Sequence, residues 1–242
     1  HLLLETLSRT RGKNPYTDLV ESRRIDGLML LSPRKDDTAL IELIESDFPM
    51  VLFGSIGHPK EVSVDTPSTD GLRDAVNHVV EFGHRLIGSI PFSPPGFSAA
   101  DGRLSELRAF LDSHGIRMDD DCVVAGDFSA ESGFAATLEL MARRPDITAI
   151  FAGNDTIALG VIGALAKLGK SVPRDVSVVG FDDLPFAGFV APPLTTVRVD
   201  AIHQGRCAAE ALMLRLKGKL VPEPRQRFKS TFIPRSSTSA VR

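Results

Sequence analysis

Several residue types are scarce in this 242-residue sequence, which has no tryptophan, one tyrosine and two cysteines. Cys122 and Cys207 lie far apart in the chain, so we expect two free thiols and not a disulfide framework. No apolar run approaches the roughly 20 residues that a membrane-spanning helix needs, and no signal peptide is visible. The formal net charge of −3 gives no excess of basic residues for a large nucleic-acid surface. These absences predict a cytoplasmic protein whose given residues do not bind DNA by themselves.

Signals of catalysis are also missing. The segment GALAKLGKS (163–171) resembles a phosphate-binding loop, but it has one residue too many between its glycines and it lies at the C-terminus of a predicted helix, where the helix dipole repels anions. FGSIG (53–57) places its serine beside the first glycine, unlike a nucleophile elbow. His78 and His84 have no cysteine or carboxylate at zinc-ligand spacing from both. We therefore expect no enzyme activity, no cofactor and no metal.

What the sequence does contain is a regular alternation of strands and helices, which predicts a mostly parallel α/β sheet. Apolar runs predict strands near 2–7, 25–31, 49–53, 86–91, 122–125, 147–152, 176–181 and 195–199. Helical periodicity predicts helices near 15–23, 37–46, 70–82, 102–114, 131–142, 155–168 and 200–217. Proline-rich interruptions near 91–96, 191–193 and 221–224 suit three chain crossings between two lobes.

The stretch 151–200 is the most informative part of the chain. Asn154 is a good N-cap for a helix that Gly169 ends and Pro173 keeps from resuming. The next strand is continuously apolar, as a parallel strand buried on both faces should be. Asp182 and Asp183 follow it directly, at the edge where open α/β sheets bind ligands.

This stretch closely resembles the effector-binding core of the lactose repressor/purine repressor family of bacterial transcription regulators. The resemblance rests on GNDTIALG (153–160), VPRDVSVVGFDD (172–183) and PPLTTV (192–197). Weaker matches follow in the family's order: ESRRIDGLMLL (21–31), EFGHRLIGSI (81–90), GRLSELRAF (102–110), GDFSAESGF (126–134) and PRSST (234–238).

The resemblance implies a type I periplasmic-binding-protein-like fold with two similar lobes, each a mostly parallel sheet flanked by helices, joined by three crossovers. We expect the first lobe to comprise 1–91 and 195–221, and the second 92–194 and 222–242. The implied function is to bind a small sugar or polyol between the lobes and so alter the affinity for operator DNA. A sugar-binding protein of an ABC importer, which shares the fold, is the alternative. Importer proteins usually carry aromatic stacking residues on both lobes, which this aromatic-poor chain does not favour.

Compared with the family pattern, the sequence lacks the DNA-binding helix-turn-helix and the first strand and helix of the core. Operator DNA is therefore expected to be a partner only through a missing N-terminal domain. The family also implies a homodimer, with the helix at 155–168 contributing to the second lobe's share of the contact.

Four residues match ligand-contacting positions of the family. Arg103 offers a fork of donors, Asn154 a donor and an acceptor, Asp182 a carboxylate for two hydroxyl groups, and Phe128 an apolar face for a sugar ring. Each has a structural alternative: Asn154 could only cap its helix, Arg103 could be an exposed charge, Phe128 could be ordinary core, and Asp182 could have a purely structural partner. The lower-ranked candidates, each expected to be structural more often than not, are Phe53, Asp65 and Phe186.

Overall fold

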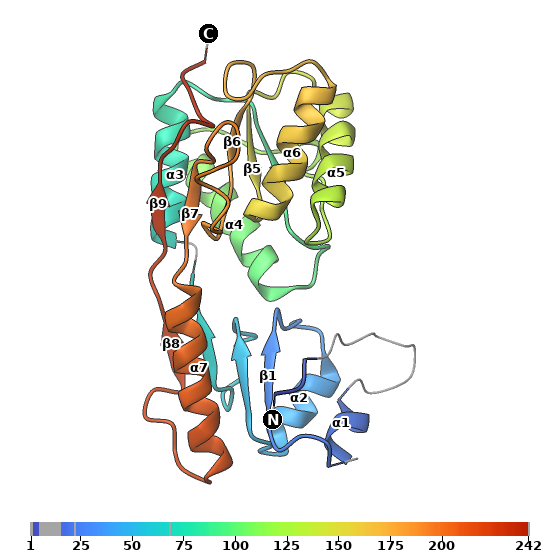
Figure 1. The fold of residues 1–242 in the computed structure, drawn as a ribbon, viewed down its shortest axis with the longest axis vertical. Coiled ribbons are helices and arrows are strands. Elements are labelled where there is room, and N and C mark those ends of the chain that lie inside the picture. Colours follow the sequence, from blue (N-terminus) through green and yellow to red (C-terminus); the bar gives the residue numbers. More distant parts are fainter. Residues whose placement is uncertain (1, 5–15, 22, 68, 242) are drawn as a thin grey trace. The chain divides into compact units, whose positions relative to one another are not determined.

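The computed structural model describes residues 2–4, 16–21, 23–67 and 69–241, and these residues form two compact units. Unit 1 consists of His1–Asp65 and Ile202–Gln226, and unit 2 of Thr66–Ala201 and Arg227–Arg242 (Figure 1). The division differs from the lobes expected at 1–91 with 195–221 and at 92–194 with 222–242. Strand β4 (Ile87–Ile90) pairs with β5 (Ala149–Ala152), and this pairing places residues 66–91 in unit 2.

Unit 1 is built on a four-stranded sheet of order β1-β2-β3-β8. Its strands are β1 (Leu28–Leu31), β2 (Met50–Phe53), β3 (Ser63–Asp65) and β8 (Arg225–Arg227), of which the first three are parallel. The helices are α1 (Thr17–Glu21), α2 (Thr38–Glu45) and α7 (Ala201–Leu216). The only tyrosine of the sequence is buried here, and its hydroxyl donates to Asp37, the N-cap of α2, over 2.9 Å.

Unit 2 contains a parallel sheet of order β4-β5-β6, in which β6 spans Ser177–Val179. An antiparallel pair, β7 (Thr196–Arg198) and β9 (Thr231–Ile233), continues from β6 through single bridges. Its helices are α3 (Thr69–Glu81), α4 (Ser98–Ser113), α5 (Ala130–Arg143) and α6 (Asp155–Lys167), with a 3₁₀ turn at Asp120–Cys122.

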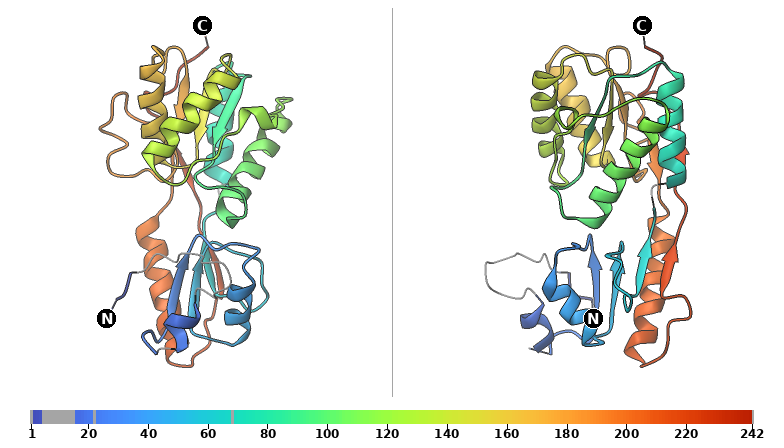
Figure 2. Two further views of the ribbon diagram at one scale, coloured as in Figure 1. Left: turned by 90° about the vertical axis from the view of Figure 1, so that its right-hand side faces the viewer. Right: turned by 180° about the vertical axis from the view of Figure 1, so that it is seen from behind.

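Helices cover both faces of the unit 2 sheet, as a buried parallel sheet requires. Successive side chains of β5 alternate between two cores: Ala149 and Phe151 pack in the core with α3 and α4, and Ile150 and Ala152 in the core with α5 and α6. Figure 2 shows the two helix pairs on opposite faces of this sheet. The sheet is therefore held from both sides, and its strand ends are fixed points.

The predicted elements are largely present, with three differences. Residues 122–125 run beside β4 with one bridge, from Ser89 to Val123, and not as a strand. The short strands β3, β8 and β9 were not predicted. Half of the strand predicted near 2–7 falls outside the described residues, and the described half, 2–4, is not in a strand. No helix in the described part of the chain is long and apolar enough to cross a membrane.

Helices α5 and α6 approach each other closely because glycines face the contact. A Cβ atom at Gly160 would lie 2.0 Å from the carbonyl oxygen of Ala130, and one at Gly133 would lie 2.4 Å from that of Ile157. Both obstacles are backbone atoms, which cannot rotate away. The close packing therefore depends on the absence of side chains at these two positions.

We predict that Gly160→Ala lowers the free energy of unfolding by about 1–3 kcal/mol, since the new methyl group must push the helices apart. The control is Gly163→Ala on the same helix, where the nearest atoms to a Cβ are Phe134 ring carbons at 3.6 and 3.9 Å. This control should be neutral or stabilising, because alanine gains about 1 kcal/mol over glycine in a helix. Urea unfolding measures both variants, and equal effects would contradict the packing argument.

Candidate functional site

Polar and aromatic side chains gather at the carboxyl ends of the three parallel strands of unit 2. Asn154 follows β5, Asp182 follows β6, and Arg103 lies on α4, the helix that follows β4. Carboxyl ends of parallel strands meet at one edge of the sheet. The four main ligand-contact candidates from the sequence, Arg103, Phe128, Asn154 and Asp182, thus all lie on unit 2.

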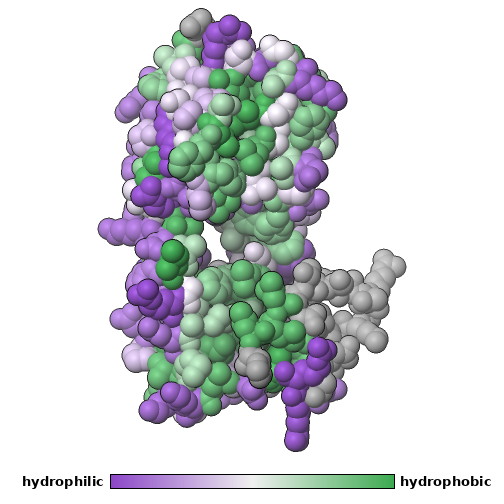
Figure 3. Space-filling view, in the orientation of Figure 1, coloured by the Kyte–Doolittle hydropathy of each residue, from purple (hydrophilic) through white to green (hydrophobic). Residues whose placement is uncertain are grey.

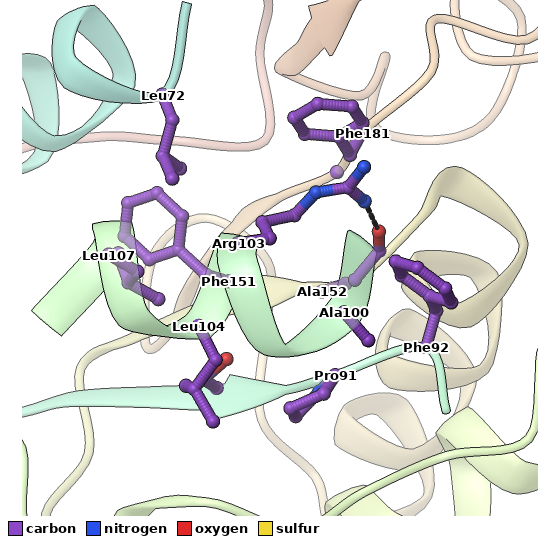
Figure 4. A pocket seen from close by; sticks show the side chains of 13 residues that line it. Leu72, Pro91, Phe92, Ala100, Arg103, Leu104, Leu107, Phe151, Ala152 and Phe181 are labelled. Carbon is purple, nitrogen blue, oxygen red and sulfur yellow. Dashed lines mark hydrogen bonds between the residues drawn. The ribbon is translucent and has the colours of Figure 1, made fainter. Parts of the chain in front are cut away.

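Arg103 is held between two aromatic rings. Its guanidinium carbon lies 3.3 Å from the centroid of the Phe181 ring and 5.0 Å from that of Phe92 (Figure 4). The same guanidinium donates a hydrogen bond to the carbonyl oxygen of Gly153, just after β5. Arg103 is half-buried and not an exposed charge, so its side chain links the ends of two strands.

A cavity of about 20 Å³ lies beneath this arginine, lined mainly by apolar side chains that include Phe151, Leu104 and Leu107 (Figure 4). Its size suits about one water molecule. A sugar ring does not fit in it, so this cavity belongs to the packing that supports Arg103.

Phe128 presents part of an aromatic wall. Its ring packs against Phe92 at a centroid distance of 5.0 Å and against the edge of Phe97 at 6.1 Å. The residue is 42% exposed and has a φ of 72°, a conformation that few residues other than glycine adopt. Phe128 is therefore not ordinary core, because a large part of its ring remains accessible.

Asn154 has the structural role that the sequence offered as an alternative. Its Oδ1 accepts from the backbone N–H of Ile157 over 2.7 Å and so caps α6. This bond fixes the orientation of the side chain and leaves its amide NH₂ group as the donor that Asn154 could offer to a ligand.

The adjacent carboxylates after β6 have different environments. Asp183 is 7% exposed at its side chain and accepts from Arg198 Nε at 2.7 Å and from Arg235 Nη2 at 2.5 Å. Burial opposes its ionisation, but the bonds from Arg235 and Arg198 outweigh it and hold the pKa of Asp183 below the usual value. Burial raises the pKa of Asp182 to about 6, although the charge of Arg103 partly opposes this rise. Asp183 is thus the ion-paired carboxylate, and Asp182 the one whose ionised form is poorly compensated.

The lower-ranked candidates are distributed over both units. Phe186 lies in unit 2, half-buried in the segment between β6 and β7. Phe53 ends β2 and Asp65 ends β3 in unit 1, and both are half-buried.

Three residues of this region were not predicted. Phe92 and Phe97 complete the aromatic wall, and Asp155 is a fully buried carboxylate beside the strand ends. An acid directly after a helix cap was visible in the sequence, but its burial was not. Among the described residues, no group of three or more histidine, cysteine, aspartate or glutamate side chains could hold a metal ion.

Comparison with known proteins identifies relatives over most of the chain. Residues 76–238 match the family model of a periplasmic binding protein-like domain. The chain is 38% identical over 200 residues to the HTH-type transcriptional regulator CelR of Thermobifida fusca, covering 81% of the chain and 58% of the regulator. It is 31% identical over 243 residues to the HTH-type transcriptional repressor CytR of Escherichia coli K12, covering 99% of the chain and 70% of the repressor. The chain therefore spans more than half, but not all, of the length of these curated relatives.

Solved structures agree with the sequence matches. A complex of the transcriptional regulator CelR with cellobiose superimposes with a TM-score of 0.83 at 34% identity, over 94% of this chain and 71% of that one. A LacI-family regulator of Enterococcus faecium with bound ribose gives a TM-score of 0.78 at 26% identity, over 94% and 85% of the two chains. These matches confirm the predicted two-lobed, type I periplasmic-binding-protein-like fold, and the named relatives are transcription regulators, not enzymes.

Replacing Asp182 or Asp183 by the uncharged asparagine should change the free energy of unfolding differently. We predict that Asp183→Asn lowers the free energy of unfolding at pH 7.5 by about 3 kcal/mol, because two arginines lose their charged acceptor. Asp182→Asn should leave the stability at pH 7.5 unchanged or raise it, because the ionised carboxylate is unfavourable in the folded state.

The pH dependence follows from the sign of each shift. The pKa of Asp182 rises from 3.8 to about 6 on folding, so the folded state binds the proton more tightly and stability falls as the pH rises from about 4 to about 6. Asp155, raised likewise to about 6, adds a fall of the same sign. Urea unfolding from pH 4 to 8 should show a smaller fall in Asp182→Asn than in the wild type. An unchanged pH profile in this variant would contradict the assignment.

Proposed function

Because the chain belongs to the LacI family of transcription regulators and carries that family's effector-binding domain, we propose that it senses a small sugar through the Arg103, Asn154 and Asp182 cluster. Effector binding would change the affinity of the whole regulator for operator DNA. The single observation that carries the proposal is the contrast between the two adjacent carboxylates: two arginines neutralise Asp183, whereas Asp182 forms no ion pair in the described ranges of the chain and has a raised pKa.

The chemistry of the cluster suits hydroxyl groups. Asp182 accepts, Arg103 donates, and the amide of Asn154 donates, while the exposed part of Phe128 can cover the C–H face of a ring. Donors from a sugar would compensate the ionised form of Asp182, which the protein alone compensates poorly. The relatives solved with cellobiose and with ribose support a carbohydrate as the effector class.

Regulation requires that the effector distinguish two states of the protein. An effector shifts the affinity for DNA only by its differential affinity for these states, typically about 1–3 kcal/mol of coupling. We place the contact with operator DNA outside the given residues, in agreement with their net charge of −3 and with relatives named for a helix-turn-helix.

A homodimer is the proposed assembly, and unit 2 offers a surface for it. Phe189 is 90% exposed, and two residues further along the chain Ala191 and Pro192 line a groove together with Ile162 and Ala166 of α6 and with residues 169–172, which include the polar Lys170 and Ser171. Apolar residues are visible on this face of unit 2 in Figure 3. An exposed ring close in sequence to a partly apolar groove suits an isologous contact, in which each copy inserts its phenylalanine into the other.

One prediction of the proposed function concerns the effector. In thermal-shift and calorimetric titrations with cellobiose, ribose and a purine base, one of the sugars should stabilise the chain, by about 2.7 kcal/mol at about 100 times its Kd. Asp182→Ala should weaken binding of that sugar roughly 10- to 150-fold, since a hydrogen bond to a charged group contributes about 1.5–3 kcal/mol.

The matched control is Asp175→Ala, which removes a carboxylate paired with Arg174 just before β6, at the opposite end of the strand. It should leave sugar affinity unchanged. Stabilisation by the purine alone would contradict the sugar assignment. Equal affinity of Asp182→Ala and wild type would place the site elsewhere.

Another prediction of the proposed function concerns the dimer. Phe189→Glu should shift the mass in sedimentation equilibrium from twice 26.1 kDa to the single-chain value, because a buried charge would replace the inserted ring. Leu220→Glu is the control, since Leu220 is 92% exposed but lies in unit 1, away from the groove residues in sequence. A dimer that persists in Phe189→Glu would exclude this surface.

A further inference from the structure

Asp155 is the one fully buried acidic residue next to the proposed effector cluster. It is the first residue of α6, yet its carboxylate is directed to the strand ends and not to solvent. Oδ1 accepts from the hydroxyl of Thr196 over 2.6 Å, and Oδ2 accepts from the backbone N–H of Leu184 over 2.7 Å. The backbone N–H of Asp155 itself donates to the carbonyl oxygen of Phe181 over 2.7 Å.

These bonds enclose the acidic turn. Phe181 and Leu184 are the residues immediately before and after Asp182 and Asp183, so Asp155 binds the turn at both of its ends. The third bond, from Thr196, ties the same carboxylate to β7.

The turn needs such support because its backbone is strained. Asp182 has a φ of 106° and Asp183 a φ of 57°, and each residue in such a conformation costs about 1–3 kcal/mol. Strain of this kind persists only where the surroundings fix the backbone. Asp183 is fixed by its two arginines, but Asp182 makes no comparable ion pair among the described side chains.

The neighbouring strand is adapted to the carboxylate. A Cβ atom at Gly180 would lie 2.3 Å from Oδ1 of Asp155, which is too close for any residue with a side chain. The absence of a side chain at residue 180 therefore allows the carboxylate of Asp155 to reach Leu184 and Thr196.

We propose that Asp155 is a positioning residue, which holds the turn 181–184 so that the carboxylate of Asp182 stays half-buried beside Arg103 and ready for the effector. It acts through hydrogen bonds to Leu184 and Phe181 and does not touch the effector itself. The role rests on the proposed function of Asp182 as the effector's acceptor.

The test needs no sugar, so its outcome is independent of the effector assignment. Carbon-detected NMR follows the side-chain carboxyl of Asp182 through a pH titration of the wild-type chain and of Asp155→Ala, Asp155→Asn and Thr196→Val. Amide exchange of Leu184 is measured in the same samples. The charged groups that act on Asp155 are Asp182 and Asp183, and Arg103 acts on Asp182.

In the wild type the Asp182 carboxyl should titrate near pH 6. In Asp155→Ala the released turn should expose Asp182, so its pKa should fall toward 3.8 and the Leu184 amide should lose its protection. Asp155→Asn keeps an acceptor for Leu184 but removes the charge, so it should retain protection and most of the raised pKa. Thr196→Val should act in the same direction as Asp155→Ala but more weakly, and it covers the case in which the alanine variant does not fold.

Asp175→Asn serves as the control and should leave both readouts unchanged. The proposal is overturned if Asp155→Ala, or Thr196→Val in its place, leaves the Asp182 titration and the Leu184 amide as in the wild type. It is also overturned if the alanine and asparagine variants shift the Asp182 pKa equally, because only the lost charge of Asp155 would then act. If these readouts respond as expected but Asp182→Ala leaves sugar affinity unchanged, the proposed function fails and the positioning role stands.

Discussion

Two adjacent aspartates at the end of a buried strand would place two negative charges side by side with little water to stabilise them. In unit 2 the two side chains have different environments. Asp183 receives two arginine side chains, from β7 and from the segment after β9. Asp182 feels the charge of Arg103 but forms no such ion pair within the described part of the chain, so its ionised form is disfavoured until donors arrive. The asymmetry leaves one carboxylate ion-paired within the fold and the other available for the effector contact proposed above.

The arginines of Asp183 also connect the proposed effector cluster to the chain crossings. Arg198 ends β7 shortly before the chain passes into unit 1, and β9 begins shortly after the chain returns. The two ion pairs of Asp183 therefore tie the acidic turn to the segments that lead into the other unit.

The sequence was sufficient where local signals decide the structure. The cap at Asn154, the stop at Gly169 and the apolar strand before Asp182 predicted α6, β6 and the acidic turn correctly. The strands β3 and β8 were missed because each is only three residues long and because Val64 is the one apolar residue among their six. The pairing of Asp183 with Arg235 was beyond local reasoning, because the partner lies 52 residues away in the chain. The cluster could thus be named from motifs, but which carboxylate is free could be decided only from contacts made by distant segments.

The most direct test of the account is an NMR titration of the two carboxyl groups in the wild-type chain, with and without a sugar that raises its melting temperature. Asp183 should titrate below 3.8 in both cases, and Asp182 near 6 without sugar. Hydroxyl donors favour the ionised form, so saturating sugar should lower the pKa of Asp182 by about one unit or more, for about 1.4 kcal/mol per unit. Two carboxyls that titrate together, or an Asp182 that does not respond to the bound sugar, would contradict the division of roles between them.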